Sequence, residues 1–270
     1  EITYQINKFK SIFTPLINND IIVVQEAIEF NKLKSSWLCF KQSVLPNNKI
    51  SINGAPNSNI AIILNSEIGI NTKLLETTKN IKTHKFLKKT SCFSIKHNKQ
   101  HILLIAVHLK NPKNEAVNVA TSLGEMIKDY KSHDHYDYHI VIGDLNLEKK
   151  NDILPTEFMN HINNVPDINI ILSKANNTQY TCSKKRSYLQ SQVEKADKES
   201  LEEKDACFYS NNLKMTHLQL HPTPEILSQN SNQLYPDIYT YYPAPEWQTD
   251  HLALIVSLEQ TIPLPNRDYN

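Results

Sequence analysis

Four short polar segments of this chain combine the residue types that bind metal ions and move protons. In chain order they are Gln25-Glu26, His108-Leu109, Gly143-Asp144-Leu145-Asn146 and Thr249-Asp250-His251. Each adjoins a run of β-forming residues, in most cases directly before it, so strands would deliver these groups to one edge of a sheet. A carboxylate-rich cluster with imidazole and amide groups suits a hard divalent cation and a phosphate ester.

The hydrophobic pattern predicts the elements that would position these segments. Apolar runs predict strands at residues 20–26, 37–44, 60–64, 91–96, 101–108, 139–142, 206–209 and 252–258. Amphipathic spacing predicts helices at 8–18 and 115–130, the second with a buried face of Val117, Ala120, Leu123, Ile127 and Tyr130. Residues 46–59 and 221–248 are rich in Asn, Pro or Tyr and are predicted to be loops.

The order of these elements predicts a single α/β domain over residues 1–270. Two stretches of strands, each with a covering helix, indicate sheet packed on sheet with helices outside. A highly charged stretch at 183–204 has few apolar residues and is predicted to be an exposed helical insertion or loop. Cys92 and Cys207 lie in apolar runs and are expected to be free buried thiols, and no Cys pair has the C-x-x-C spacing of a zinc cluster.

Composition and charge give only weak information about function. The formal net charge is +1, from 29 basic and 28 acidic side chains, which gives no global attraction to nucleic acid or to an anionic membrane. No apolar run reaches the roughly 18 residues that a membrane helix needs. No signal peptide is visible in the chain, so a soluble protein is expected, with a monomer favoured.

Taken together, the ordered segments resemble the endonuclease/exonuclease/phosphatase superfamily. The landmarks of that family are a Gln-Glu at a strand end, a His-Leu, a Gly-Asp-x-Asn, an Asp near a later strand and a terminal Ser/Thr-Asp-His, and this chain has Asp205 in the fourth place. The match covers about residues 8–258. The resemblance implies a deoxyribonuclease-I-like fold: a four-layered α/β sandwich with two mainly antiparallel central sheets flanked by helices.

The resemblance also implies a metal site. Glu26 would ligate Mg²⁺ or Mn²⁺, and Asp250 would contribute to the same site or position it, because both cations prefer oxygen ligands. A surface carboxylate at a strand end is the alternative interpretation of Glu26. The family usually has a further metal-binding Asn at the end of an earlier strand, and this chain has only Asn7 before its first predicted helix.

By the same resemblance, the remaining motif residues would carry out in-line attack of water on phosphorus. Asp144 would orient and deprotonate the water, and Asn146 would hold the water or the phosphate. Alternatively, Gly-Asp-x-Asn is simply an Asx turn. His251 would contact the phosphate and stabilise charge, with its tautomer fixed by a hydrogen bond to Asp205. His108 would bind phosphate or assist the leaving oxygen, although a His at the end of an apolar strand is often structural.

The substrate class depends on weaker signals. Lys184, Lys185 and Arg186, together with other basic residues at 82–89 and 149–150, could form a rim that tracks a phosphate backbone, which favours a nuclease. Solvated loop lysines are the alternative. A phosphatase acting on a phosphoinositide or another phosphomonoester is the second interpretation, although the extensions typical of inositol 5-phosphatases are missing. Sphingomyelin-type hydrolysis and an inactive module that binds a protein partner are further alternatives.

Overall fold

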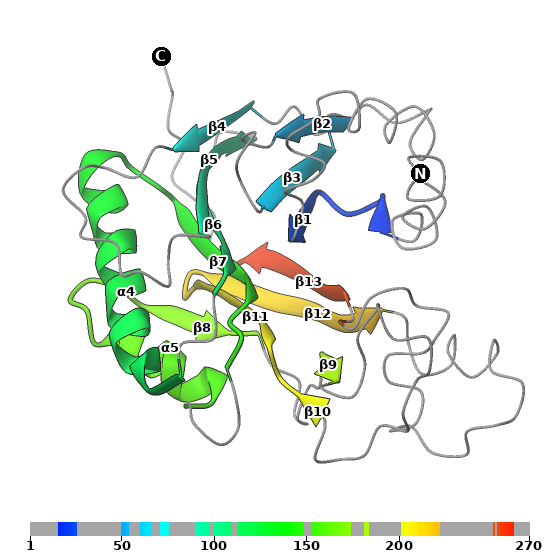
Figure 1. Cartoon of the computed structure of the whole chain (residues 1–270). Coiled ribbons are helices and arrows are strands. Elements are labelled where there is room, and N and C mark those ends of the chain that lie inside the picture. Colours follow the sequence, from blue (N-terminus) through cyan, green and yellow to red (C-terminus); the bar gives the residue numbers. More distant parts are fainter. Residues whose placement is uncertain are drawn as a thin grey trace, which may run out of the picture.

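A six-stranded mixed sheet forms the centre of this protein, as the computed structural model shows (Figure 1). The structure describes residues 16–25, 50–53, 60–65, 71–75, 90–97, 100–109, 113–147, 153–173, 181–183, 201–221, 251 and 253–261. In spatial order the sheet contains β4 (Asn71–Leu75), β5 (Ser91–His97), β6 (Gln100–His108), β7 (Tyr138–Asp144), β11 (Asp205–Ser210) and β8 (Ile170–Leu172). β6 and β7 are parallel, and the other neighbouring pairs are antiparallel.

The parallel pair is joined by a helix, because a parallel connection must return along the sheet before the next strand begins. The 3-10 turn η4 (Lys113–Glu115) and α4 (Ala116–His133) make this crossover. A second helix, α5 (Pro155–Asn163), begins with Pro at its first position and lies against α4. Both helices cover the same face of the central sheet (Figure 1).

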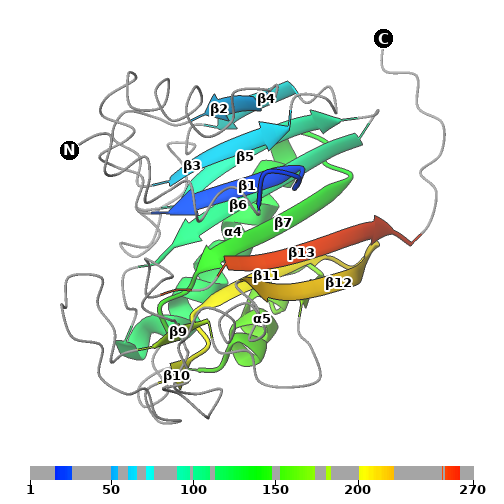
Figure 2. The same ribbon diagram turned by 90° about the vertical axis from the view of Figure 1, so that its right-hand side faces the viewer.

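Smaller antiparallel sheets cover the opposite face. β1 (Ile21–Gln25), β3 (Ile60–Asn65) and β2 (Ile50–Asn53) form one of them, in the spatial order β1-β3-β2. β12 (Leu213–His221) and β13 (Ala253–Gln260) form another. Figure 2 shows β1, β3, β12 and β13 in front of the central sheet, with α4 and α5 behind it. β9 (Cys182–Ser183) and β10 (Leu201–Glu202) pair as a short ribbon.

Alternate side chains of β6 enter two different cores. Leu103, Ile105 and Val107 pack with the buried faces of α4 and α5. Leu104 and Ala106 instead pack with residues of β3 in the second layer. Successive side chains of a strand point to opposite faces of the sheet, so a strand buried on both faces contributes alternate residues to two cores. The described residues therefore form three layers: the helices, the central sheet and the smaller sheets.

The mixed α/β class predicted from the sequence is confirmed. The predicted strands that coincide with observed ones are β1, β3, β5, β6, β7, β11 and β13, and the predicted helix at 115–130 coincides with α4. Cys92 and Cys207 are buried free thiols, as expected. None of the helices in the described ranges has the length and apolar character that a membrane span requires.

Several sequence predictions fall outside the described residues. They are the strand at 37–44, the loop at 221–248 apart from its first residue, which belongs to β12, and all but the final turn of the helix at 8–18. The ends of the insertion predicted at 183–204 are partly seen, because β9 and β10 pair there, whereas 184–200 is not described. The single-domain organisation stays a prediction.

Two sequence predictions are wrong. The predicted loop at 46–59 contains β2, which pairs along its length with β3. Val117 is 39% exposed rather than part of the buried face of α4. The buried stripe of that helix is centred on Ala116, Ala120 and Leu123, and Val117 lies about 100° around the helix from the first of these. Other strands and helices of the described residues were also not predicted from the sequence: β4, β8, β9, β10, β12 and α5.

Candidate active site

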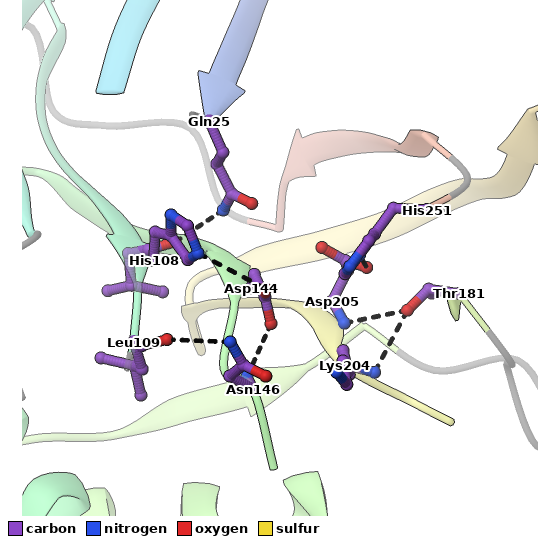
Figure 3. Close-up of polar contacts among 10 residues, drawn as sticks. Gln25, His108, Leu109, Asp144, Asn146, Thr181, Lys204, Asp205 and His251 are labelled. Atoms are coloured by element: carbon purple, nitrogen blue, oxygen red, sulfur yellow. Dashed lines mark hydrogen bonds and ion pairs between the residues drawn. The ribbon is translucent and has the colours of Figure 1, made fainter. Parts of the chain in front are cut away.

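His108 and Asp144 end two adjacent parallel strands at the same edge of the central sheet. They are register partners in the β6–β7 pair, and both are buried. His108 Nε2 lies 3.8 Å from Asp144 Oδ2, which is an ion-pair distance and is longer than a hydrogen bond. Parallel in-register strands therefore bring together an imidazole and a carboxylate that are far apart in the chain, as Figure 3 shows.

Asp205 brings a second carboxylate to this edge. It begins β11 and is the register partner of Asp144 across the antiparallel β7–β11 pair. Burial, and then the negative charge of Asp205, raise the pKa of Asp144 to about 7, against the opposing effects of His251, the Asn146 backbone N–H and Lys204. A carboxyl group with a pKa near neutrality can both hold and release a proton at physiological pH.

His251 is held by Asp205. Its Nδ1 lies 2.7 Å from Asp205 Oδ2 (Figure 3). Because an ionised carboxylate only accepts hydrogen bonds, Nδ1 carries the proton in this contact. This is the contact expected from the sequence. It fixes the imidazole tautomer, with the proton on Nδ1.

The turn after β7 fixes the Asp144 side chain. The backbone N–H of Asn146 donates to Asp144 Oδ1 at 2.6 Å, and Asn146 has a left-handed φ of 51°. This is the Asx turn that the Gly-Asp-x-Asn segment was alternatively expected to form. The Asn146 side chain donates from Nδ2 to the Leu109 carbonyl at 3.2 Å, so its amide also connects the ends of the two parallel strands.

Two residues of this site were missed by sequence reasoning. Thr181 is fully buried, and its Oγ1 accepts the backbone N–H groups of Lys204 at 3.1 Å and of Asp205 at 3.0 Å. It thereby supports the backbone at the start of β11. Lys204 contributes positive charge that lowers the pKa of Asp144. No local pattern marks either residue, because both act through partners distant in the sequence.

The structure thus brings together five of the residues predicted to form the site: His108, Asp144, Asn146, Asp205 and His251. The other five, Glu26, Asp250, Lys184, Lys185 and Arg186, lie outside the described residues. In the part of the chain that the structure describes, no group of three or more His, Cys, Asp or Glu side chains is arranged to hold a metal ion.

The donor chemistry of this edge nevertheless fits a hard divalent cation. Asp144 and Asp205 place two carboxylates on neighbouring strands, and the resulting repulsion contributes to the raised pKa of Asp144. A nearby cation would offset that repulsion. Both predicted metal ligands are also direct chain neighbours of residues with contacts at this edge, since Glu26 follows Gln25 and Asp250 precedes His251.

Comparison with solved structures identifies the fold. D. rerio TDP2 complexed with a single strand DNA product is 12% identical to this chain, with a TM-score of 0.57 over 96% of this chain and 93% of that chain. An endonuclease/exonuclease/phosphatase from Bacteroides vulgatus is 12% identical, with a TM-score of 0.58 over 96% and 91%. The human Nocturnin catalytic domain with bound sulfate anion is 15% identical, with a TM-score of 0.55 over 94% and 86%.

No protein-family model and no curated protein sequence matches this chain. The structural likenesses cover nearly the whole chain and agree with one another. The chain therefore has the fold of the endonuclease/exonuclease/phosphatase superfamily. The family indicated by the ordered sequence motifs is the same.

Proposed function

We propose that this chain is a divalent-metal-dependent phosphoester hydrolase, of nuclease type. The observation that carries the proposal is the meeting of three strand ends at one edge. These ends supply His108, Asp144 and Asp205, and Asp205 is hydrogen-bonded to His251, which lies two residues before β13. A carboxyl group with a pKa of about 7 beside two imidazoles is suited to proton transfer at neutral pH.

In the proposed reaction, Asp144 accepts a proton from a water molecule whose oxygen attacks phosphorus in line with the leaving oxygen. The Asn146 N–H holds Oδ1 of Asp144, so Oδ2 is the oxygen assigned to this proton. His251 contacts the phosphate through Nε2 and stabilises the charge that develops on its oxygens. The bond between phosphorus and the leaving oxygen then breaks, and His108 would assist that oxygen.

Glu26 and Asp250 are the residues proposed to hold Mg²⁺ or Mn²⁺. When bound, the cation would polarise the phosphoryl oxygens and neutralise part of their charge. Within the chain, the Asp205 carboxylate holds His251 in the tautomer that presents Nε2. Thr181 supports that arrangement by capping the backbone N–H group of Asp205.

Nucleic acid is the substrate class we propose. Lys184, Lys185 and Arg186 follow β9 directly in the chain, and Thr181, just before β9, contacts the backbone of the site. In our proposal, this basic run, which follows β9 directly in the sequence, binds the phosphate backbone of the substrate. The D. rerio TDP2 structure, which shares this fold, contains single strand DNA product.

The test compares plasmid DNA, a phosphoinositide panel and sphingomyelin as substrates, with Mg²⁺ and with chelator. We expect metal-dependent cleavage of DNA, reduced at least about 100-fold in Asp144→Ala and in His251→Ala. Circular dichroism would check that both variants are folded. Wild-type rates in both variants would overturn the site assignment. Turnover of a lipid substrate alone would instead identify a phosphatase or a sphingomyelinase.

An inactive binding module makes a different prediction. A folded protein that hydrolyses none of the three substrates, and whose melting temperature does not rise with Mg²⁺ or Mn²⁺, would overturn the enzyme proposal, because a bound cation must stabilise the folded state by mass action.

A further inference from the structure

Gln25 makes a hydrogen bond that crosses between two sheets. It is the last residue of β1, and its Nε2 donates to the Val107 carbonyl of β6 at 2.6 Å. Figure 3 shows the Gln25 side chain extending from the end of its strand toward the strand that carries His108. The bond therefore joins the strand end before Glu26 to the residue directly before His108.

A glycine makes this contact possible. A Cβ at Gly143 would overlap both the Val107 carbonyl oxygen and Gln25 Nε2, and Gly143 has a φ of +140° that L side chains rarely adopt. Gly143 directly precedes Asp144 in β7. The ends of β1, β6 and β7 thus meet at the side-chain amide of Gln25. In each strand, the residue at this meeting point directly precedes a residue assigned to the site.

Apolar side chains also join β1 to the central sheet. Ile21 and Val23 of β1 pack in the same core as Ile140 and Ile142 of β7. Apolar packing is non-directional, so it tolerates small shifts of one strand along another. A hydrogen bond has a narrow range of distance and angle. Among the described strands, β1 stands at one end of the order β1-β3-β2 and is held through its backbone by β3.

We infer that Gln25 is a positioning residue: its hydrogen bond to Val107 fixes where the end of β1 stands relative to His108 and Asp144. It thereby sets the affinity of the site for a divalent cation and the rate of the step that depends on it. The inference rests on the proposed function and adds a residue to it that would touch neither substrate nor cation.

The test uses Gln25→Met, which keeps the length of the side chain and removes its N–H. A second variant, Gln25→Glu, keeps the shape but replaces the donor by an acceptor facing a carbonyl. We expect both to weaken Mn²⁺ binding about 10-fold, as measured by calorimetric titration, because the one directional hydrogen bond from Gln25 to Val107 is lost. The kcat for DNA cleavage should fall by a similar factor.

A matched control lies at the other end of the same strand. Asn19 Nδ2 donates to the Leu16 carbonyl at 2.8 Å, which is the same type of bond two residues before β1. Asn19→Leu removes that bond away from the site. It should lower the melting temperature in chelator while leaving Mn²⁺ affinity and kcat within about twofold of wild type.

The outcomes separate the two proposals. Wild-type Mn²⁺ affinity and kcat in a folded Gln25→Met protein, with only a lower melting temperature, would show that Gln25 is structural and would overturn this inference while leaving the proposed function intact. Equal losses in Gln25→Met and Asn19→Leu would overturn it as well. A wild-type protein that neither binds Mn²⁺ nor cleaves DNA would overturn the proposed function, and this inference with it.

Discussion

Asp144→Asn is expected to stabilise the folded protein while it abolishes hydrolysis. The pKa of Asp144 is raised from 3.8 to about 7, mainly by burial and then by Asp205. Below about pH 4 the carboxyl group is protonated in both the folded and the unfolded chain, so its ionisation has no effect on the free energy of unfolding. As pH rises from about 4 to about 7, the unfolded chain ionises first, and the free energy of unfolding falls.

The size of that fall follows from the two pKa values. At about 1.36 kcal/mol for each pH unit, a rise from 3.8 to about 7 corresponds to at most about 4 kcal/mol. Asn keeps an oxygen that can accept the Asn146 N–H, and it carries no charge. The free energy of unfolding of the variant should therefore not fall as the pH rises from about 4 to about 7. Asp144→Asn should therefore gain up to about 4 kcal/mol on wild type between about pH 4 and pH 8.

Urea denaturation in chelator, at several pH values from about 4 to 8, measures this difference. Asp167→Asn is the matched control, because it removes a carboxylate whose side chain is 84% exposed. Asn also tolerates the left-handed φ of 70° at that position. A constant difference between Asp144→Asn and wild type across this pH range would refute the argument that ionisation of the buried Asp144 carboxyl group opposes folding.

Three further predictions concern other parts of the molecule. Burial, with a contribution from Lys131, lowers the pKa of His139 to about 4, so the free energy of unfolding should fall by about 3 kcal/mol as pH drops from about 6.5 to 4. His139→Gln should remove that fall, as measured by urea denaturation. An equal fall in the free energy of unfolding in variant and wild type would show that His139 does not cause it. Asp205→Asn should lower kcat for DNA cleavage at least about 100-fold by releasing His251, and should move any residual acidic limb of the pH–rate profile to lower pH because Asp144 loses a negative neighbour. An unchanged kcat would show that the Asp205–His251 contact is not used. Gly124→Ala should lower thermal stability by about 1–3 kcal/mol although Ala favours helix, because its Cβ would lie 2.7 Å from Val165 Cγ2 and 2.8 Å from the Ile162 carbonyl; a rise in melting temperature would show that α5 can move aside.

Elements with long, regular apolar patterns could be predicted from the sequence. α4 has apolar residues at helical spacing over 18 residues, and β3, β6 and β7 are nearly continuous apolar runs. The missed elements have weaker patterns. β8 has three residues, and β2 reads Ile-Ser-Ile-Asn inside an Asn-rich stretch. α5 spans nine residues and buries only one face, through Pro155, Phe158 and Ile162.

The sequence by itself determined which chemical groups stand at strand ends. Gln25, His108 and Asp144 each close a strand, and local apolar runs are enough to predict where those strands stop. The family motifs, taken in order, also predicted the contact between Asp205 and His251. The positions of Glu26, Asp250 and the basic run at 184–186 stay predictions.

Only the tertiary structure decided how these groups influence one another. The register of β7 against β11 places Asp205 beside Asp144, and burial in the same place raises the pKa of Asp144 to about 7. The contacts of Gln25 with Val107 and of Thr181 with Asp205 likewise join residues 82 and 24 positions apart. Strand register, burial and hydrogen bonds to distant backbone depend on how the whole chain packs, so no local pattern of residues specifies them.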